Sequence, residues 1–220
     1  MTELLLLALV GGVVAVDGVA AVKSMISRPF VVGWVVGLLL GEPVLGGQIG
    51  ILLEVYLLVA VPSGGGRQPE GGIATVVAVG AATAVAPAAA AAGLGVAAGL
   101  GWGWIAGESQ ALLRRWNARR ADDPARHLGV RDVVRAQLLG LGADFGRGAV
   151  LAVVGVVLAR ILAPILAGPW PASPMLTWAL VSMGALASLG IVLRGVAETR
   201  GRAVLFGVGL LAGAFLLGGA

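Results

Sequence analysis

The segment from Ile49 to Thr75 restricts the possible folds of this chain more than any other part of it. It begins as an apolar run that contains one carboxylate, Glu54, then breaks into residues rich in proline and glycine, and then turns apolar again. A carboxylate inside a membrane-length apolar run is costly because hydrocarbon offers it no water. Such a break is tolerated at membrane depth only where protein or a water-filled cavity surrounds the backbone. The segment therefore predicts a polar site within a bundle of spanning helices, as in transporters with broken helices.

The composition places the whole chain in a membrane. Of its 220 residues 59% are hydrophobic and 12% are charged, whereas soluble domains carry about 25% charged residues. A spanning helix needs roughly 20 apolar residues, and several apolar runs are shorter or longer than this. The pattern predicts an all-α integral membrane protein, a polytopic helical bundle with broken helices and re-entrant hairpins. The runs fall near residues 4–22, 30–41, 43–61, 71–106, 149–168, 174–193 and 203–219.

Two details of the apolar runs refine this prediction. No basic region precedes the first run, so we expect no cleaved signal and insertion of the whole chain in the plasma membrane. The run 71–106 is long enough for two passes. Pro87 is the predicted break within it, because proline removes a helical hydrogen bond and clashes with the preceding turn.

The arginines divide the chain into three parts. Residues 107–148 hold eight of the fifteen lysines and arginines, and the positive-inside rule places this section in the cytoplasm as a loop or amphipathic helix. Residues 1–106 form the N-terminal membrane half with the predicted site, and residues 149–220 form the C-terminal spans. We interpret the arginines as topogenic charge that also attracts anionic lipid headgroups, with docking of a soluble partner as the alternative. No nucleic acid is expected, because no basic groove studded with aromatic residues accompanies the charge.

A series of short motifs is spaced along the first half of the chain. The motifs are Ser27-Arg28-Pro29, Gly41-Glu42-Pro43, Gly50 with Glu54, and Gly64-Gly65 leading to Pro69-Glu70. In this order and spacing they resemble the N-terminal half of the IIC subunit of the mannose/fructose/sorbose family of the bacterial sugar phosphotransferase system. Asp17 matches an aspartate found in many relatives. Pro87 and the basic section fall where that family has a proline-containing helix and a charged stretch.

The resemblance implies a function, a location and partners. It implies the permease (IIC) subunit of a phosphoenolpyruvate-dependent sugar phosphotransferase system, which binds and translocates a hexose or amino-hexose across the bacterial inner membrane. The implied partners are a membrane IID subunit, within an oligomer, and the soluble phosphocarriers IIB and IIA. The subunit itself is then not an enzyme, because phosphate travels on histidines of IIA and IIB. The one histidine of this chain, His127, lies in the arginine-rich section with no catalytic set of residues around it.

Glu54 is the first candidate for a sugar ligand. A carboxylate accepts charge-assisted hydrogen bonds from sugar hydroxyls, and these are stronger than neutral ones. The alternative is a structural ion pair with Lys23, Arg28 or Arg67, which would equally account for a carboxylate at membrane depth. Asp17 is expected to form a structural ion pair with Lys23 or Arg28 rather than to bind the ligand.

Gln68 and Glu70 are the next candidates. They offer donors and acceptors at a turn whose glycines let the backbone approach a ligand closely, with an exposed loop tip as the alternative. No cofactor and no metal site are expected, because no cluster of histidines, cysteines or carboxylates is visible. The remaining candidates for the substrate site are Ser63, Gly64, Gly65 and Gln48.

Two other functions stay open at this point. The chain could be a divergent paralogue that no longer transports and acts as a membrane scaffold or sensor, which Pro62 and the short length favour. It could also be a stand-alone secondary transporter for another small polar solute. Binding of sugars by the purified protein separates the scaffold from the transporters.

Overall fold

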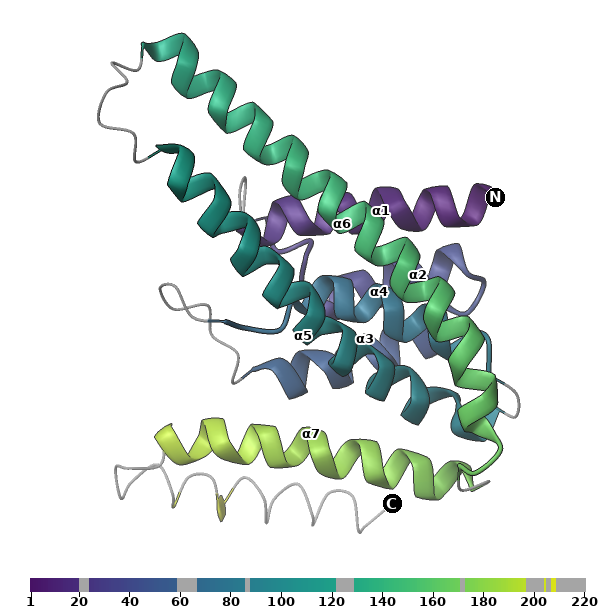
Figure 1. The fold of residues 1–220 in the computed structure, drawn as a ribbon. Coiled ribbons are helices and arrows are strands. Elements are labelled where there is room, and N and C mark those ends of the chain that lie inside the picture. The colour runs from purple at the N-terminus through teal and green to yellow at the C-terminus, as the bar shows by residue number, and fades with distance from the viewer. Residues whose placement is uncertain are drawn as a thin grey trace.

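The computed structural model describes most of the chain, and its regular elements in that part are all helices (Figure 1). This confirms the predicted polytopic all-α bundle. The described residues are 1–19, 24–58, 67–85, 88–121, 129–170 and 173–196, with Val204, Gly207 and Val208. The helices are α1 (Thr2–Val19), α2 (Pro29–Leu39), α3 (Pro43–Leu57), α4 (Gly71–Ala82), α5 (Ala88–Ala121), α6 (Val130–Ala167) and α7 (Pro174–Val196).

The bundle contains both helices long enough to span a membrane and helices too short to do so. Among the described residues, three helices are long and apolar enough to cross a membrane by length and composition: Ala90–Arg119, Val130–Ala167 and Pro174–Arg194. By contrast, α2, α3 and α4 have 11, 15 and 12 residues, fewer than the roughly 20 that a span needs. The helix α2 is the short element that the run 30–41 predicted, and α3 and α4 are also shorter than the runs that contain them.

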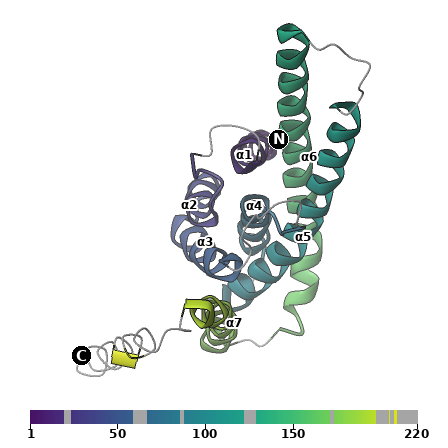
Figure 2. The same ribbon diagram turned by 90° about the vertical axis from the view of Figure 1, so that its left-hand side faces the viewer.

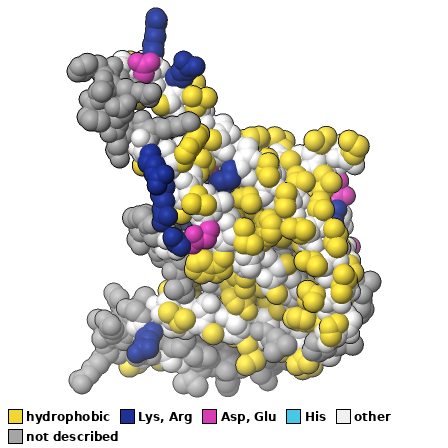
Figure 3. Space-filling model, viewed as in Figure 1, with side chains coloured by type: hydrophobic (Ala, Val, Ile, Leu, Met, Phe, Trp, Pro, Cys, Tyr) yellow, Lys and Arg dark blue, Asp and Glu magenta, His cyan; other side chains and the backbone are white. Residues whose placement is uncertain are grey.

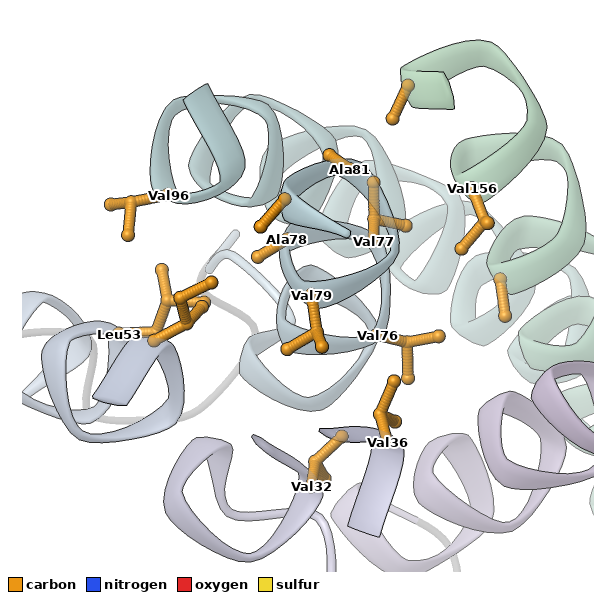
Figure 4. Close-up of a cluster of buried hydrophobic side chains, with 14 of the residues drawn as sticks. Val32, Val36, Leu53, Val76, Val77, Ala78, Val79, Ala81, Val96 and Val156 are labelled. Atoms are coloured by element: carbon orange, nitrogen blue, oxygen red, sulfur yellow. The ribbon is translucent and has the colours of Figure 1, made fainter. Parts of the chain in front are cut away.

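The short helix α4 occupies the centre of the bundle. In Figure 2 it lies inside a ring of helices, and α1, α2, α3, α5 and α6 all contact it. Every residue from Gly72 to Ala82 is buried, and none of them is charged. The close-up in Figure 4 shows the valines of α4 among apolar side chains of four neighbours: Val32 and Val36 of α2, Leu53 of α3, Val96 of α5 and Val156 of α6.

Glycines bring α2 and α3 into backbone contact. A Cβ on Gly33 would overlap the carbonyl oxygen of Gly46 and would lie 2.8 Å from the Cα of Gly50. Small residues permit such an approach in lipid, where packing rather than the hydrophobic effect holds helices together. The turn between the helices includes Gly41 at a φ of +79°, a conformation that glycine adopts without strain. We call the contact made by Gly33, Gly37, Gly46 and Gly50 the glycine seam.

The helices α5 and α6 extend well beyond a bilayer. Their 34 and 38 residues correspond to about 51 and 57 Å of helix, against a hydrocarbon thickness of about 30 Å. In its described part, the section 107–148 is therefore the end of α5 and the beginning of α6 rather than a loop. Alanine, leucine and arginine, which are frequent there, are good helix formers. We call residues 112–121 and 129–139, at the upper left of Figure 1, the basic hairpin.

The remaining sequence predictions can be placed on these helices. The run 71–106 does contain two helices, since α4 ends at Ala82 and α5 begins at Ala88; Pro87 itself lies outside the described residues. The predicted spans 149–168 and 174–193 correspond to the second half of α6 and to α7. The predicted span 203–219 lies outside the described residues except for three positions.

Candidate functional site

Several of the predicted polar residues meet around the N-terminal end of α4. A Cβ on Gly71 would lie 3.0 Å from the ring of Pro29, and a Cβ on Gly72 would lie 2.8 Å from the carbonyl oxygen of Ser27. The start of α4 is therefore packed against the turn that precedes α2. The end of α1, the start of α2, the second half of α3 and the segment 67–70 come together at this end of the bundle.

Asp17 fixes the turn between α1 and α2. Its Oδ1 accepts hydrogen bonds from the backbone N–H and the hydroxyl of Ser24, at 2.7 and 2.6 Å, and its Oδ2 accepts one from the backbone N–H of Ser27 at 2.9 Å. Two of these donors are backbone groups, which no sequence pattern had indicated. Lys23, one of the predicted ion-pair partners, lies outside the described residues. Arg28, the other predicted partner, makes its ion pair with a different carboxylate.

That carboxylate is Glu54, which joins the second half of α3 to the start of α2. Its Oε1 accepts a hydrogen bond from Nη1 of Arg28 at 2.7 Å, and its Oε2 accepts one from the backbone N–H of Phe30 at 3.3 Å. A negative charge is stabilised at a helix N-terminus by the dipoles of the peptide groups. The Glu54 side chain is 24% exposed and the Arg28 side chain 54%. A carboxylate has about four lone-pair positions, so the group can still accept hydrogen bonds from a ligand.

Glu70 lies on the other side of the α4 N-terminus and is bound to Arg147 of α6. The two side chains form a bidentate pair, with Nη1 at 2.8 Å from Oε2 and Nη2 at 3.2 Å from Oε1. Both side chains are only 10% exposed. Arg147 also donates from Nε to Oδ1 of Asp144 at 3.1 Å. The sequence places Arg147 only among the arginines that set topology, although an ionisable residue in an apolar helix is by default a functional candidate.

The segment 67–70 is held against α5 as well. The backbone N–H of Glu70 donates to the carbonyl oxygen of Gly103 at 2.9 Å, and Arg67 forms an exposed ion pair with Glu108 at 3.2 Å. Gly107 is in such close contact with the carbonyl group of Gln68 that a Cβ there would overlap its oxygen. The segment that carries Gln68 and Glu70 is therefore anchored to α5 and α6, and is not an exposed loop tip.

The other predicted site residues are placed differently. Gln48 lies on the exposed face of α3 together with Val44 and Ile51. Ser63, Gly64 and Gly65 lie outside the described residues, and so does His127. In the part of the chain that the structure describes, no group of three or more His, Cys, Asp or Glu side chains could hold a metal ion.

Positive charge gathers at the projecting end of the molecule. Figure 3 shows Lys and Arg side chains over the tip of the α5–α6 pair and along the same edge, while hydrophobic side chains cover much of the remaining face. Apolar side chains are exposed among the charges on the basic hairpin, including Leu112, Trp116, Val133 and Leu138. Among the side chains that the structure describes in the basic hairpin, the exposed arginines are Arg114, Arg115, Arg119, Arg131 and Arg135.

These features define a class of protein: a multi-pass helical membrane protein in which short broken helices bring polar side chains together inside the bundle, as transporters do. Comparison of the sequence with models of known protein families identifies the family. A family model described as the PTS system sorbose-specific IIC component matches residues 1–211. The chain therefore belongs to this family of phosphotransferase-system IIC components, as the motif series predicted. It is a multi-pass permease component of the bacterial inner membrane for sugar translocation, and phosphoryl transfer resides in the IIA and IIB components.

Comparison with curated proteins found no match. Among solved structures, a chain described as "Structure of membrane protein" has 17% sequence identity and a TM-score of 0.79. The alignment covers 98% of this chain and 87% of the other. At this identity the likeness supports the fold and carries no information about the sugar.

Proposed function

We propose that this IIC component binds a hexose or amino-hexose at the N-terminal end of α4 and carries it across the membrane. The observation that carries the proposal is the meeting of short helices there. The ends of α2, α3 and α4 come together with Glu54 and the segment 67–70 inside a bundle of longer helices. Irregular backbone at membrane depth is compatible with a cavity that holds a polar solute, and a sugar is such a solute.

The chemistry of this end suits a polyhydroxylated ligand. The first turn of a helix has backbone N–H groups without an intrahelical acceptor, so α4 can offer donors from residues 71–73. Glu54 and Gln68 supply acceptors beside them, and Ser63, Gly64 and Gly65 are proposed to complete the site, on the family resemblance. Glu70 belongs to the same end, but both its oxygens already face Arg147. A site built to satisfy hydroxyl groups rejects analogues that lack them.

The position of Gln48 supports a partner contact better than a sugar contact. A polar side chain that faces lipid is costly, and Gln48 lies on an exposed apolar surface of α2 and α3. We propose that the IID subunit covers this surface, whose other members include Phe30, Trp34, Leu38, Val44 and Ile51.

The basic hairpin is proposed to lie on the cytoplasmic side and to contact the IIB phosphocarrier and anionic headgroups.

Exchange of Glu54 for glutamine tests the sugar site. The variant keeps the shape of the side chain and removes its charge, and we expect uptake to fall at least about tenfold, the effect of weakening one or two charge-assisted hydrogen bonds. Uptake of radiolabelled mannose, fructose, sorbose and N-acetylgalactosamine is measured in cells that also make the IID, IIB and IIA components. Glu42→Gln, in the exposed turn at the far end of α2 and α3, is the matched control.

A second variant separates the two roles of Glu54. If Glu54 serves only as the ion-pair partner of Arg28, Arg28→Gln will reduce uptake as much, and the double variant will be no worse than either single one. A ligand role predicts that Glu54→Gln has the larger effect on sugar affinity. Unchanged uptake in Glu54→Gln would overturn the site assignment, and absence of binding for all four sugars would favour the scaffold or sensor.

A further inference from the structure

We infer that Arg147 is a positioning residue of this permease: acting through Glu70, it holds the segment 67–70 and the N-terminus of α4 in place for the sugar. The inference rests on the proposed function, because it assigns a role within the same site. Glu70 is then the anchor of the segment rather than a direct ligand of the sugar. The two residues are 77 positions apart in the sequence.

Hydrogen bonds to several acceptors hold the guanidinium of Arg147 in one orientation. Its guanidinium donates to both oxygens of Glu70, to Asp144, to the carbonyl oxygen of Ala106 at 3.2 Å and to the hydroxyl of Ser109 at 3.1 Å. Each of the three guanidinium nitrogens therefore has an acceptor. Asp144 lies three residues before Arg147 on the same helix and orients the guanidinium from its own side. A planar guanidinium held in this way offers a carboxylate a single bidentate geometry.

Glu70 connects the fixed guanidinium of Arg147 to α4, the helix whose N-terminus forms the proposed site. It is the residue immediately before α4, so its position sets where the first N–H groups of α4 point. Its backbone N–H is bound to Gly103 of α5, and its side chain is bound to α6. Arg67, at the other end of the segment, forms an exposed ion pair with Glu108, which contributes little because solvent screens it. The buried pair with Arg147 is the stronger of these two ion pairs.

Loss of Arg147 would leave Glu70 buried beside Asp144 without its counter-charge. An isolated buried carboxylate is strongly unfavourable, so the segment is expected to move toward water and to take the start of α4 with it. The sugar would then meet a displaced set of donors and acceptors. The consequence is a loss of affinity, although neither Arg147 nor Glu70 touches the sugar.

The first test measures the dependence of uptake on sugar concentration, for whichever of the four sugars binds, in the full chain with its partner components. For Arg147→Gln we expect the half-saturating concentration to rise about tenfold, the cost of one misplaced charge-assisted hydrogen bond, at a normal amount of inserted protein. Glu70→Gln should have a similar effect, and the double variant should be no worse than either single one. Arg147→Lys keeps the charge and should recover part of the affinity.

Arg160→Gln is the matched control. Arg160 also belongs to α6. It forms an ion pair with Glu3 of α1 and donates from Nε to the carbonyl oxygen of Gly80 at 3.3 Å, near the C-terminal end of α4 and away from the segment 67–70. A half-saturating concentration that stays at the wild-type value in Arg147→Gln overturns the inference. A large effect of Glu70→Gln with none of Arg147→Gln also overturns it, since Glu70 would then act on the sugar directly. If Arg147→Gln does not insert, the comparison is made with Arg147→Lys and with the double variant.

A second readout does not depend on sugar. The chain contains no cysteine, so Arg67→Cys with Glu108→Cys gives a single pair for a short bifunctional thiol reagent, quantified by peptide mass spectrometry. The yield of the cross-link should fall at least severalfold when Arg147→Gln is added and should stay unchanged with Arg160→Gln. An unchanged yield with Arg147→Gln refutes the anchor. If none of the sugars is taken up but the yield falls as expected, the proposed function fails while the anchoring by Arg147 stands.

Discussion

Replacement of Gly33 by alanine should force α2 and α3 apart and destabilise the protein. The added Cβ would lie 2.8 Å from the Cα of Gly50, while ordinary contacts of this kind begin near 3.4 Å. The helices must therefore separate by about 0.6 Å at this point, and more at Gly46, whose carbonyl oxygen would overlap the new atom. Both obstacles are backbone atoms, so no change of side-chain rotamer can relieve the overlap.

The size of the effect follows from two opposing contributions. Overpacking of a tight contact costs about 1–3 kcal/mol, and the upper part of this range applies because only backbone can move. In the opposite direction, alanine in place of glycine stabilises a helix by about 1 kcal/mol through its higher helix propensity. The net loss is about 2 kcal/mol, which corresponds to a decrease in melting temperature of about 4–8 °C for a chain of this size.

The assay is thermal unfolding of the purified protein in detergent, followed by the amount that remains in the native size-exclusion peak. Gly101→Ala is the matched control, because Gly101 is also helical and nothing lies within 4 Å of an added Cβ. We expect this control to melt at the wild-type temperature or slightly above it. A Gly33→Ala variant that melts as high as Gly101→Ala would refute the proposed backbone contact of the glycine seam.

Two further predictions concern hydrogen bonds that hold helices together. Asp17→Ala removes the acceptor of all three hydrogen bonds from Ser24 and Ser27. It should lower the free energy of unfolding by about 2–3 kcal/mol, since hydrogen bonds to a charged group are stronger than neutral ones. An unchanged melting temperature would contradict this. Tyr56→Phe removes the 3.0 Å hydrogen bond from the hydroxyl to the carbonyl oxygen of Val181. A loss of about 1 kcal/mol is expected, measured in the same thermal assay, and a more stable variant would show that the α3–α7 contact does not depend on this bond.

The arrangement of helices was largely predictable because its signals are local. Gly41 and Pro43 after about ten apolar residues marked the end of α2, and the break between α4 and α5 falls beside Pro87 as expected. The helix α3 ends at Leu57, before the end of the apolar run 43–61 that predicted it. For the basic section the sequence left a loop and an amphipathic helix as alternatives. Its charge does not distinguish a loop from a helix, whereas the helix-forming residues in it agree with α5 extending to Ala121 and α6 beginning at Val130.

The contacts of the candidate site were much less predictable. The sequence identified Glu54 and Glu70 as carboxylates that need an explanation, but only the packing of distant segments shows that Arg28 faces Glu54 and Arg147 faces Glu70. In the sequence Arg147 is indistinguishable from the neighbouring arginines, because a charge count does not separate a residue inside the bundle from one outside it. The turn held by Asp17 uses backbone donors, which leave no trace in the pattern of residue types.

The central position of α4 has a consequence for the biogenesis of the protein. A helix of 12 residues is about 18 Å long, too short for the insertion machinery to recognise as a span of its own. The helix can enter the membrane only together with neighbours that cover it, and α5, which contacts it most extensively, leaves the ribosome after it. The core of this permease is therefore completed only after α5 has been made, when α5 encloses a helix that was synthesised before it.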